Sequence, residues 1–590
     1  MRVTVLREIP EDAELSRNWN RLVGRMEHPE VFFTYQWALA ASRAFRSMLS
    51  PLLLLMHEAD ELCGVAALAV PPHGQPFASF LSSSTADYCD IVSAPETRAS
   101  VLACLLQEIS DLELRGLTLA NLPSESSTLK VLPTIARAVR FHLTSRPAYE
   151  CGLVELGSED QRHQMLHTVT HKSREQRGLK KLAKIGPLHL SHVVKLHEAE
   201  DCLRQVVSAQ VSRFLATDRI SPLLRPERRL FLREITSLLA SEEWLKISEL
   251  KVNGQAVAWN YGFHFGDSWF WYLPSFKVGY EDCSPGSCLL RLLVEEGCAD
   301  PSLRWLDLGL GDESYKNRFA TTVRKTSHVQ LSSSLPDHVR IIGRQLVTTE
   351  AMRFPQAGDR LRRVKQLMHS LSHRLRDKGV SATLAHLGRR AARIGISRDE
   401  ILLFEGPATE AAKQSDLCLN PLTWENLAEA AIQNADDSDT IQYLLRAAAR
   451  LKTGGTAGLV LHDQLGNAVH FLAVTSCDGF HVAEIDYTLE LADDSRAMIF
   501  DCWTPARYRG LGYYSLAIRL AASNVQTSGK NAFIFCAATN TPSIRGILKA
   551  GFTYRFSLVR RRNLGVSKVV QRSQTDSIAS SMARSAPASG

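Results

Sequence analysis

The chain has 590 residues, of which 45% are hydrophobic and 22% are charged, and its formal net charge is +7. This length exceeds what one hydrophobic core supports, so we expect about three or four domains. The mild positive charge does not by itself indicate a nucleic-acid partner. No apolar run approaches the ~20 residues of a transmembrane helix, and the segment Met1 to Glu8 turns charged too soon for a signal peptide. The 12 cysteines lack metal-binding spacing, so we expect a cytoplasmic protein with free thiols and no metal site.

Residues 1–155 alternate helical and extended patterns, which predicts a first α/β module. Residues 37–41 have the pattern of a helix. The apolar runs 52–55 and 65–70 are typical of two buried, paired strands with a turn near Ala59.

Residues 156–335 repeat this order of elements and are expected to form a second module. A basic helix is predicted over 163–184 and a long helix over 228–239. Three apolar segments predict a three-stranded meander, whose first turn is the strong hairpin signal Asn253-Gly254. These segments are 245–252, 256–265 and 269–273.

Residues 336–395 differ in kind, because basic side chains dominate. Between Arg353 and Arg393 there are 11 Lys or Arg residues and two acids, Asp359 and Asp377, with apolar residues at helical spacing. This pattern predicts a basic amphipathic helical linker. Two interpretations stay open: a solvated helix packed on a neighbouring domain, and peripheral contact with an anionic membrane surface.

Strand patterns resume in residues 396–565, which we expect to form a third module. Apolar runs such as 401–404 and 469–474 predict its strands. The Ser- and Ala-rich residues 566–590 cannot bury a core and are expected to form a disordered tail.

Two short motifs near the carboxyl end indicate a phosphate-bearing ligand. Arg507-Tyr508-Arg509-Gly510-Leu511-Gly512 follows the apolar run 497–500 and precedes a helical pattern. Asn540-Thr541-Pro542-Ser543 follows a second apolar run, 533–536, and also opens a helical pattern. A strand, a glycine turn and a helix N-terminus aim backbone N–H groups at one point, which suits a pyrophosphate. The alternative is a glycine-rich structural turn.

In this order the two motifs resemble the acyl-CoA site of the GNAT N-acetyltransferase superfamily. The resemblance implies acetyl-CoA or another acyl-CoA as co-substrate, and direct transfer needs orientation and proton removal rather than a metal. Many members have a tyrosine general acid where this chain has Ile547. The departing thiolate would then take its proton from water or from another side chain, for which Tyr513 and Tyr514 are the candidates. The implied cofactor contacts are Arg507, Arg509, Gly510, Leu511, Gly512, Tyr513, Asn540 and Ser543.

A base that deprotonates the acceptor is expected on the central strands of this module. Glu484, Asp486 and Glu490 are the candidates, and alternation over 484–488 would place Glu484 and Asp486 on one face of a strand. Exposed carboxylates without a catalytic role are the alternative, because a base needs reach and a suitable pKa and the sequence shows neither.

A second candidate site lies in the middle of the chain. Residues 303–308 predict a strand that runs into Asp307-Leu308-Gly309-Leu310-Gly311-Asp312, and Tyr315 and Lys316 follow. The glycines let backbone approach a ligand. Asp307 or Asp312 would take a proton from an acceptor amine or hydroxyl, while Lys316 would neutralise a phosphate or developing charge. The alternative is an Asp cap with a structural ion pair.

With Val31 to Trp37 and Tyr272 to Phe276, this segment is similar to the CelD/BcsL family of GNAT-like proteins linked to cellulose biosynthesis. The similarity covers residues 10–330 and implies a tandem of two GNAT-like modules, as in Fem-type peptidyl transferases. Tyr315, Lys316 and Arg174 are candidate substrate contacts. Arg174 belongs to the basic helix, which is either a solvated face or a cradle for the phosphate of a nucleotide sugar or polysaccharide.

The sequence thus predicts an α/β (α+β) protein of three GNAT-like modules with mixed sheets flanked by helices. We expect an acyltransferase that moves an acetyl or other acyl group from acyl-CoA to an amine or hydroxyl of a small-molecule or saccharide acceptor, in exopolysaccharide, cellulose or envelope biosynthesis. One alternative is a Fem-like transferase that uses aminoacyl-tRNA, the only reading with a nucleic-acid partner. The other is a catalytically silent scaffold that binds a nucleotide or polysaccharide.

Overall fold

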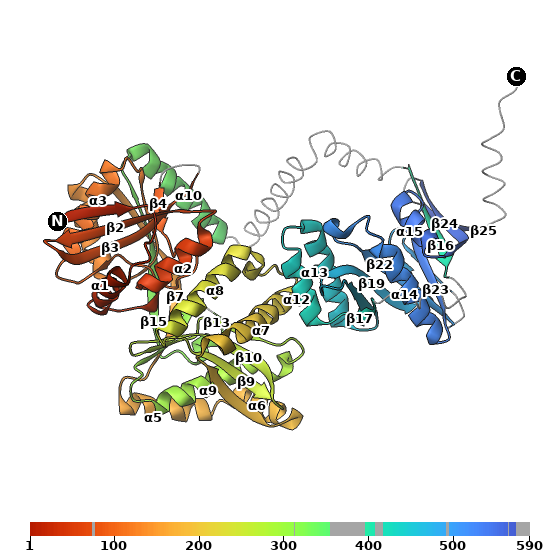
Figure 1. Cartoon of the computed structure of the whole chain (residues 1–590), viewed down its shortest axis with the longest axis horizontal. Helices are drawn as coiled ribbons and strands as arrows, with labels where there is room; N and C mark the ends of the chain where they lie inside the picture. Colours follow the sequence, from red (N-terminus) through yellow and green to blue (C-terminus); the bar gives the residue numbers. More distant parts are fainter. Residues whose placement is uncertain are drawn as a thin grey trace, which may run out of the picture. The chain divides into compact units, whose positions relative to one another are not determined.

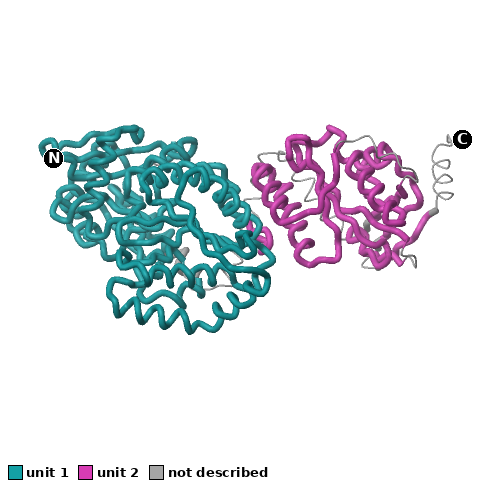
Figure 2. The backbone as a smooth tube through the Cα atoms, turned by 60° about the horizontal axis from the view of Figure 1, so that its bottom comes forward, with its two compact units in different colours: residues 1–213, 221–354 teal, residues 214–220, 355–590 magenta. Residues whose placement is uncertain are grey.

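The computed structural model describes residues 1–72, 77–311, 313–353, 396–406, 417–490, 495–563 and 566–573. The chain divides into two compact units, which Figure 2 shows in separate colours. Unit 1 contains residues 1–213 and 221–354, and unit 2 contains residues 214–220 and 355–590. Most of the predicted linker lies outside the described residues. Among the described helices, none is long and apolar enough to cross a bilayer.

The first half of unit 1 is a sheet flanked by helices (Figure 1). The two apolar runs form the hairpin β2–β3, and Ala59 in its turn has a φ of 53°, so this prediction is confirmed. The predicted helix is α2, which the Thr34 side chain caps by accepting from the N–H of Trp37. The elements are β1 (Arg2–Leu6), α1 (Ala13–Gly24), η1 (Val31–Phe33), α2 (Tyr35–Phe45), β2 (Ser50–Glu58), β3 (Glu61–Val70), β4 (Phe77–Phe80), β5 (Val92–Ser93), α3 (Arg98–Asp111), β6 (Gly116–Pro123), α4 (Ser127–Ala138) and β7 (His142–Glu155).

The second half of unit 1 continues this sheet and adds another. The long sheet has the order β1-β2-β3-β4-β6-β15-β7-β14-β12-β11, with β5 beside β3, and the second sheet has the order β13-β10-β9-β8. β7 and β15 pair antiparallel from Leu153↔Thr322 to His142↔Ser332, so both halves share one continuous ladder. The elements are α5 (Glu159–Thr170), α6 (Ser173–Ile185), β8 (Leu188–Val193), α7 (Leu196–Leu215), η2 (Pro222–Leu224), α8 (Pro226–Ser241), β9 (Ile247–Val252), β10 (Gln255–Tyr261), β11 (His264–Phe265), β12 (Ser268–Phe270), β13 (Leu273–Phe276), η3 (Glu281–Cys283), α9 (Pro285–Ala299), β14 (Trp305–Leu310), η4 (Lys316–Arg318), β15 (Thr322–Ser332) and α10 (Leu335–Arg353).

Two predictions for this half are wrong in detail. The single basic helix expected over 163–184 is two helices, α5 and α6, which are separated at His171 and Lys172. The expected meander fails at its third strand, because β12 pairs parallel with β14 in the long sheet and β13 pairs with β10 instead. The chain changes sheets at Trp271, whose N–H donates to the carbonyl oxygen of Asp307 at 2.7 Å.

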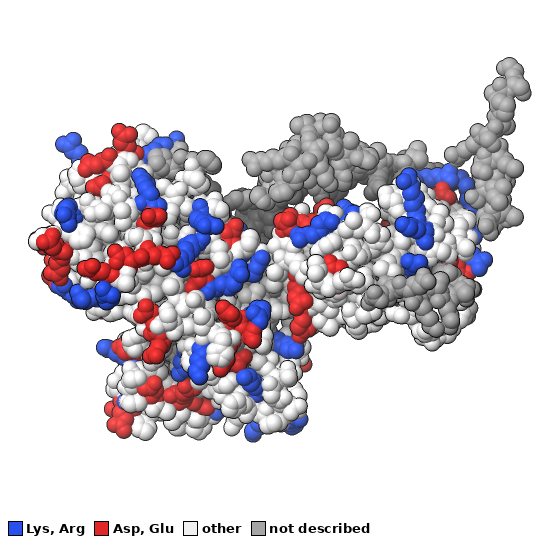
Figure 3. Space-filling view, in the orientation of Figure 1, with Lys and Arg blue, Asp and Glu red and all other residues white. Residues whose placement is uncertain are grey.

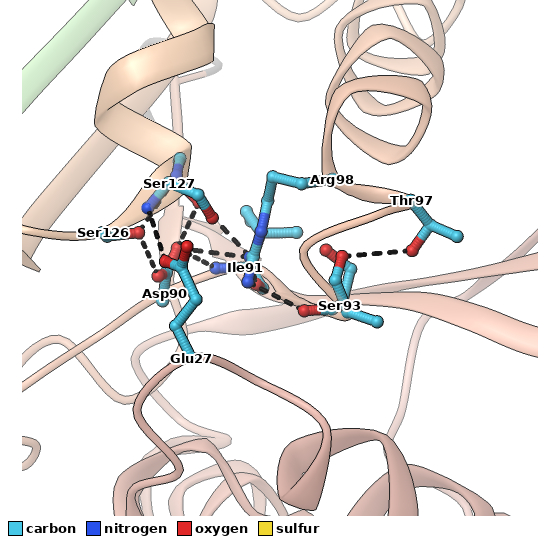
Figure 4. Close-up of polar contacts among 10 residues, drawn as sticks. Glu27, Asp90, Ile91, Ser93, Thr97, Arg98, Ser126 and Ser127 are labelled. Atoms are coloured by element: carbon cyan, nitrogen blue, oxygen red, sulfur yellow. Dashed lines mark hydrogen bonds and ion pairs between the residues drawn. The ribbon is translucent and has the colours of Figure 1, made fainter.

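A buried arginine ties α3 to α4 in the first half (Figure 4). Arg98 is 2% exposed and donates to two backbone carbonyls, one of them that of Ser93 at 2.8 Å. Its Nη1 lies 3.7 Å from the carboxylate of Asp90. That carboxylate in turn accepts from the hydroxyls of Ser126 and Thr128, both at 2.6 Å, where α4 begins. The buried positive charge thus has a partner that is itself fixed by hydrogen bonds.

Unit 2 is built on one sheet with the order β17-β18-β19-β22-β23-β16-β24-β25. Helices α14 and α15 pack on one face, in a cluster that includes Ile499 and Ile547. The hairpin β20–β21 packs against the other face, where Ile485 joins Met498. The elements are β16 (Ile396–Glu405), β17 (Leu419–Pro421), α12 (Trp424–Gln433), α13 (Ser438–Thr453), β18 (Ala457–His462), β19 (Ala468–Ser476), β20 (His481–Val482), β21 (Tyr487–Thr488), β22 (Arg496–Trp503), η5 (Ala506–Tyr508), α14 (Tyr513–Thr527), β23 (Asn531–Ala537), α15 (Thr541–Lys549), β24 (Thr553–Asn563) and β25 (Val566–Ser573).

The predicted tail begins too early. Residues 566–573 form β25, which pairs antiparallel with β24 from Asn563↔Val566 to Phe556↔Ser573, while 574–590 lie outside the described residues. The three Val residues of this segment favour a strand, and Lys568 and Arg572 suit its position at the edge of the sheet, despite the Ser-rich sequence that follows. The α/β (α+β) fold class, with mixed sheets flanked by helices, is confirmed.

We predict that Arg98→Leu lowers the free energy of unfolding by about 3 kcal/mol, because removing one partner of a buried ion pair leaves the other charge uncompensated. Urea denaturation of the full chain, followed by fluorescence, checks this. Arg25→Leu is the matched control, since Arg25 pairs with Glu61 and Glu96 at the exposed surface and should matter little. If both substitutions lowered the unfolding free energy by the same amount, the buried Arg98 pair would not be more stabilising than the exposed Arg25 pairs.

Candidate active site

Two neighbouring parallel strands of unit 2 separate partway along their length. β22 and β23 pair only over residues 496–499 and 531–534. Past this point β22 stays paired with β19 up to Trp503, and β23 stays paired with β16 up to Ala537. The backbone groups that β22 and β23 turn toward each other are therefore not paired between these strands. Such groups need other partners, and amides of a ligand can supply them.

A bulge re-aims β22 where the strands diverge. Asp501 has a left-handed φ of 47°, and the register with β19 shifts between Phe500 and Trp503. The carbonyl oxygen of Asp501 accepts from the hydroxyl of Tyr443 at 3.1 Å, and its carboxylate pairs with Arg450. The distorted backbone is thus held in place from α13, as expected for a bulge that positions a site.

The loop after β22 leads into the N-terminus of α14. Gly510 and Gly512 have φ values of 82° and 87°, which favour glycine, and a Cβ at either position would meet nothing within 4 Å. Gly512 is the N-cap, no side chain of the described residues caps the helix, and its first backbone bond joins the N–H of Leu516 to the Gly512 oxygen at 3.1 Å. Leu511, between the glycines, is 65% exposed. The N–H groups of the first turn therefore have no side-chain cap among the described residues, and a helix end of this kind favours an anion.

Both arginines of the motif lie close to this loop, each held by contacts with its neighbours. Nη2 of Arg507 lies 2.9 Å from Oδ1 of Asp436. Nε of Arg509 donates to the carbonyl oxygen of Thr504 at 3.0 Å, and its guanidinium lies 5.1 Å from the ring centre of Trp503. Both guanidiniums keep unused donors that can bind phosphate oxygens.

The second motif is joined to the first through α14. Asn540 caps α15, because its Oδ1 accepts from the N–H of Ser543 at 3.2 Å. Oγ of Ser543 lies 2.8 Å from the hydroxyl of Tyr514. The Tyr514 ring lies against Gly546, where a Cβ would be 2.5 Å from the ring, so glycine is required for this close approach of α14 and α15. The structure therefore brings the two sequence motifs together.

The two candidate proton donors have different surroundings. Burial raises the pKa of Tyr514, so its hydroxyl stays protonated at neutral pH and can donate. The ring of Tyr513 instead packs edge-on against Tyr508, with 6.3 Å between ring centres.

His470 of β19 lies beside Tyr514, with 5.5 Å between the rings, and its Nδ1 is 2.8 Å from Oγ1 of Thr504. Burial lowers the pKa of His470 to about 3, so it is neutral, and its Nε2 has no hydrogen-bond partner among the described residues. The only sequence signal for this residue is a histidine inside an apolar strand.

The predicted carboxylate bases do not lie on a central strand. Glu484 and Asp486 are in the turn between β20 and β21, where Asp486 has a φ of 50°, and both are exposed, as is Glu490. The prediction that Glu484 and Asp486 share a strand face is wrong, because the buried residues of this segment are three and four positions apart instead of alternating. Those buried residues are Val482, Ile485 and Leu489.

Unit 1 contains a similar divergence of parallel strands. β12 pairs with β14 over residues 268–270 and 305–307, after which the chain crosses to β13 in the second sheet while β14 continues. The predicted catalytic residue Asp307 lies where the strands part. It is 2% exposed, and its carboxylate accepts from the hydroxyl of Tyr88 at 2.9 Å and from the N–H of Gly309 at 2.7 Å.

A second carboxyl group approaches the same turn from the first half. Oδ2 of Asp87 accepts from the N–H of Leu310 at 3.4 Å, and a Cβ on Gly309, with its φ of 70°, would lie 2.6 Å from that oxygen. Burial raises the pKa of Asp87 to about 7, and the neighbouring Asp307 adds to the rise. Burial also raises the pKa of Asp307, and that of Glu30 to about 8 although Arg324 lies 2.5 Å away. With pKa values of about 7 and about 8, Asp87 and Glu30 exchange protons near neutral pH.

Lys316 is buried rather than presented to a ligand. It is 4% exposed, its Nζ donates to the carbonyl oxygen of Leu310 at 2.7 Å, and it pairs with Glu313 at 2.9 Å. The lysine therefore closes the turn after β14. It is neither part of an ion pair at the surface nor open to a phosphate group. Asp312 lies outside the described residues.

The other two predicted substrate contacts lie on different elements. The hydroxyl of Tyr315 accepts from Nε1 of Trp271 at 3.1 Å. Arg174 of α6 donates to Oγ of Ser284, the N-cap of α9, at 3.3 Å. Their role toward a substrate stays a prediction. Among the described residues, no group of three His, Cys, Asp or Glu side chains is arranged to hold a metal ion.

Residues 171–317 match the family model described as an acetyltransferase (GNAT) domain. The matched range runs from the end of α5 through Asp307 to the turn that Lys316 closes. The second half of unit 1 thus contains a GNAT-type acyltransferase domain. None of the curated proteins compared is a significant match to the chain.

Several solved structures are similar over more than half of the chain. FemX is 8% identical, covers 53% of this chain and 95% of its own, and has a TM-score of 0.40. The C-terminal domain of a putative lysylphosphatidylglycerol synthetase from Agrobacterium fabrum is 12% identical, with coverages of 57% and 96% and a TM-score of 0.37. A tandem GNAT protein from the clavulanic acid biosynthesis pathway is 12% identical, with coverages of 56% and 98% and a TM-score of 0.33. Similarities this distant assign no substrate, and the resemblance to the CelD/BcsL family stays a prediction.

We predict that Asp87→Asn gains stability relative to the wild type as the pH rises from 5 to 8. Folding raises the pKa of Asp87 to about 7, so between about pH 4 and that value the folded chain holds a proton that the unfolded chain loses. The unfolding free energy of the wild type therefore falls over this range, and asparagine removes the fall. Urea denaturation at pH 5, 6, 7 and 8 measures the difference, which should widen with pH. A difference that stays constant would contradict the assigned burial of this carboxyl group.

Proposed function

We propose that this protein transfers an acyl group from acyl-CoA to an amine or hydroxyl, with acyl-CoA bound in unit 2. One observation carries the proposal. At a single edge of the unit 2 sheet, β22 and β23 diverge, the N-terminus of α14 opens at Gly512 without a side-chain cap among the described residues, and α15 begins after its N-cap Asn540. A strand opening beside a positive helix end suits a ligand that has both amides and a pyrophosphate.

Different groups at this edge would bind the phosphates and the amides of acyl-CoA. The N–H groups of the first turn of α14, with Arg507 and Arg509, would hold the pyrophosphate. The open backbone edges of β22 and β23 would pair with the amides of the pantetheine arm. Acyl-CoA supplies an activated thioester when bound. The protein's contribution is to orient that thioester toward the acceptor, which converts a bimolecular reaction into an effectively intramolecular one.

Direct transfer also requires two proton movements. As the acceptor nitrogen or oxygen bonds to the thioester carbon, the carbon–sulfur bond breaks and the departing thiolate takes up a proton. Tyr514 is the best-placed donor, because its protonated hydroxyl lies between α14 and Ser543 of α15. We retain an exposed carboxylate of the β20–β21 turn, Glu484 or Asp486, as the proposed acceptor of the proton from the incoming nucleophile.

The carboxyl groups of unit 1 support a second transfer centre. Asp87 and Asp307 come from separate halves, meet at the turn after β14, and lie beside or within the range that matches the GNAT domain family. This centre would use the same chemistry of proton removal from an acceptor, and its acyl donor is an aminoacyl or acyl ester. Saccharide or envelope acceptors remain the proposed substrates of the protein as a whole.

We predict that Gly510→Asp and Gly512→Asp each weaken acetyl-CoA binding roughly 100-fold or more, because like charges brought together in a binding site cost several kcal/mol. Titration calorimetry with acetyl-CoA measures the affinity. Gly529→Asp is the matched control, since Gly529 also has a positive φ, 77°, and open space around it, but lies after the other end of α14. It should bind acetyl-CoA as the wild type does. If the Gly510 and Gly512 variants bound acetyl-CoA with unchanged affinity, the assignment of the acyl-CoA site to unit 2 would be wrong.

A further inference from the structure

Three positively charged side chains lie directly opposite one another on neighbouring strands of unit 2. Arg398 of β16 is opposite Arg561 of β24, and Arg561 is opposite Lys568 of β25. Residues paired in this way have side chains on the same face about 5 Å apart, where like charges destabilise the sheet. Arg572, opposite Ser557, lies on this face too, because it is an even number of residues from Lys568. We call these four residues the basic row.

Few negative charges balance the basic row. Arg398 lies 3.2 Å from a carboxylate oxygen of Glu400 on the same strand. Arg561 and Lys568 are exposed, and within the described part of the chain their side chains have no ion-pair or hydrogen-bond partner. Asp399 points to the opposite face, where it pairs with Arg560 at 2.9 Å. The row thus retains an excess of positive charge that nothing described in unit 2 neutralises.

The basic row continues the face and the edge that form the proposed acyl-CoA site. Leu402 shares a face of β16 with Arg398 and packs in the cluster that contains α14 and α15 residues. β16 is antiparallel to β23, and the N–H of Ala538, just past the end of β23, donates to the carbonyl oxygen of Glu400 at 2.9 Å. Arg398 therefore lies beyond that end, at the edge where α15 begins at Thr541.

Protection of an edge strand explains only part of this arrangement. β25 is the last strand of the sheet, and cations on an edge strand oppose pairing with other chains. That reason applies to Lys568 and Arg572, but not to Arg398 and Arg561, which lie on the inner strands β16 and β24. Figure 3 shows blue atoms over the part of unit 2 that carries β16, β24 and α15. A bound anionic ligand would offset the repulsion within the row.

We propose that the basic row binds the acceptor of unit 2 and that this acceptor is a chain carrying repeated carboxylate or phosphate groups. The inference rests on the proposed acyl transfer and specifies its substrate class. Cations spread across three strands, each about 5 Å from the next, match a chain of anionic groups better than one small anion. On the three strands that carry the row, the described large apolar side chain that is exposed is Val570, at 45%. So little apolar surface on these strands favours a polymer over a lipid bilayer.

The test uses a double variant of the full chain, Arg561→Gln with Lys568→Gln. Two probes carry the proposed chemistry, polygalacturonate with carboxylates and inorganic polyphosphate with phosphates, and neutral dextran serves as the uncharged comparison. We expect the wild type to bind at least one polyanion and the variant to bind it about tenfold more weakly, given up to about 1 kcal/mol for each exposed charge contact. The melting temperature should not fall, because the change relieves like-charge repulsion.

Matched controls separate this surface from general charge effects. Lys130→Gln with Arg137→Gln removes two exposed cations from α4 of unit 1 and should leave polyanion binding unchanged. Acetyl-CoA affinity should be the same in all three proteins. If the double variant bound the polyanions with the same affinity as the wild type, the inference would be overturned. Binding by the wild type only to phosphatidylglycerol vesicles, and to neither polymer, would also overturn it. If the wild type fails to bind acetyl-CoA, the proposed function falls, while the polymer titrations still decide whether the row binds anionic chains.

Discussion

The need to pair every backbone N–H and C=O shapes both units in the same way. In unit 2 the parallel strands β22 and β23 part after residue 499, and in unit 1 β12 and β14 part after Asp307. On their other sides β22 stays paired with β19 and β14 stays paired with β7, so each of these two strands is open on one edge only. The other functional features are arranged around these openings: the bulge at Asp501, the glycine turns, and the helices α14 and α9 that begin beyond them. Water or a ligand must complete the hydrogen bonding there.

The charged side chains around these openings differ in burial between the two units. In unit 1 the carboxylates are buried and hydrogen-bonded, as when Asp307 accepts from both Tyr88 and Gly309, and burial raises the pKa of Asp307. In unit 2 the arginines stay near the surface, and the buried groups Tyr514 and His470 are both neutral. A neutral interior beside exposed cations is suited to holding an anionic ligand while protecting a thioester from water.

Local patterns predicted those elements that depend on near neighbours in the chain. The hairpin β2–β3 follows from two apolar runs, and Asn253-Gly254 forms the β9–β10 turn with φ values of 51° and 77°. The positive φ angles of Gly510 and Gly512 agree with the motif. Asp87 and His470 could not be found in this way, because each acquires its role from residues distant in sequence, Asp87 from Leu310 and His470 from Tyr514. The residues around Glu484 have a strand-like pattern although they form a turn, because short apolar spacing does not separate the two.

The position of β16 has a consequence for how unit 2 is made. This strand comes first in its sheet along the chain, yet Ile401 pairs with Ala537 on one side and with Leu558 on the other. On the ribosome, β16 emerges long before either neighbour, and both of its edges stay open until nearly the whole unit has been synthesised. Contacts so distant in sequence slow folding and expose unpaired strand edges. The inner strand β16 is therefore paired only late in synthesis, and a chain truncated before β24 would present Ile401 and Leu403 of β16 to other proteins as an uncovered edge.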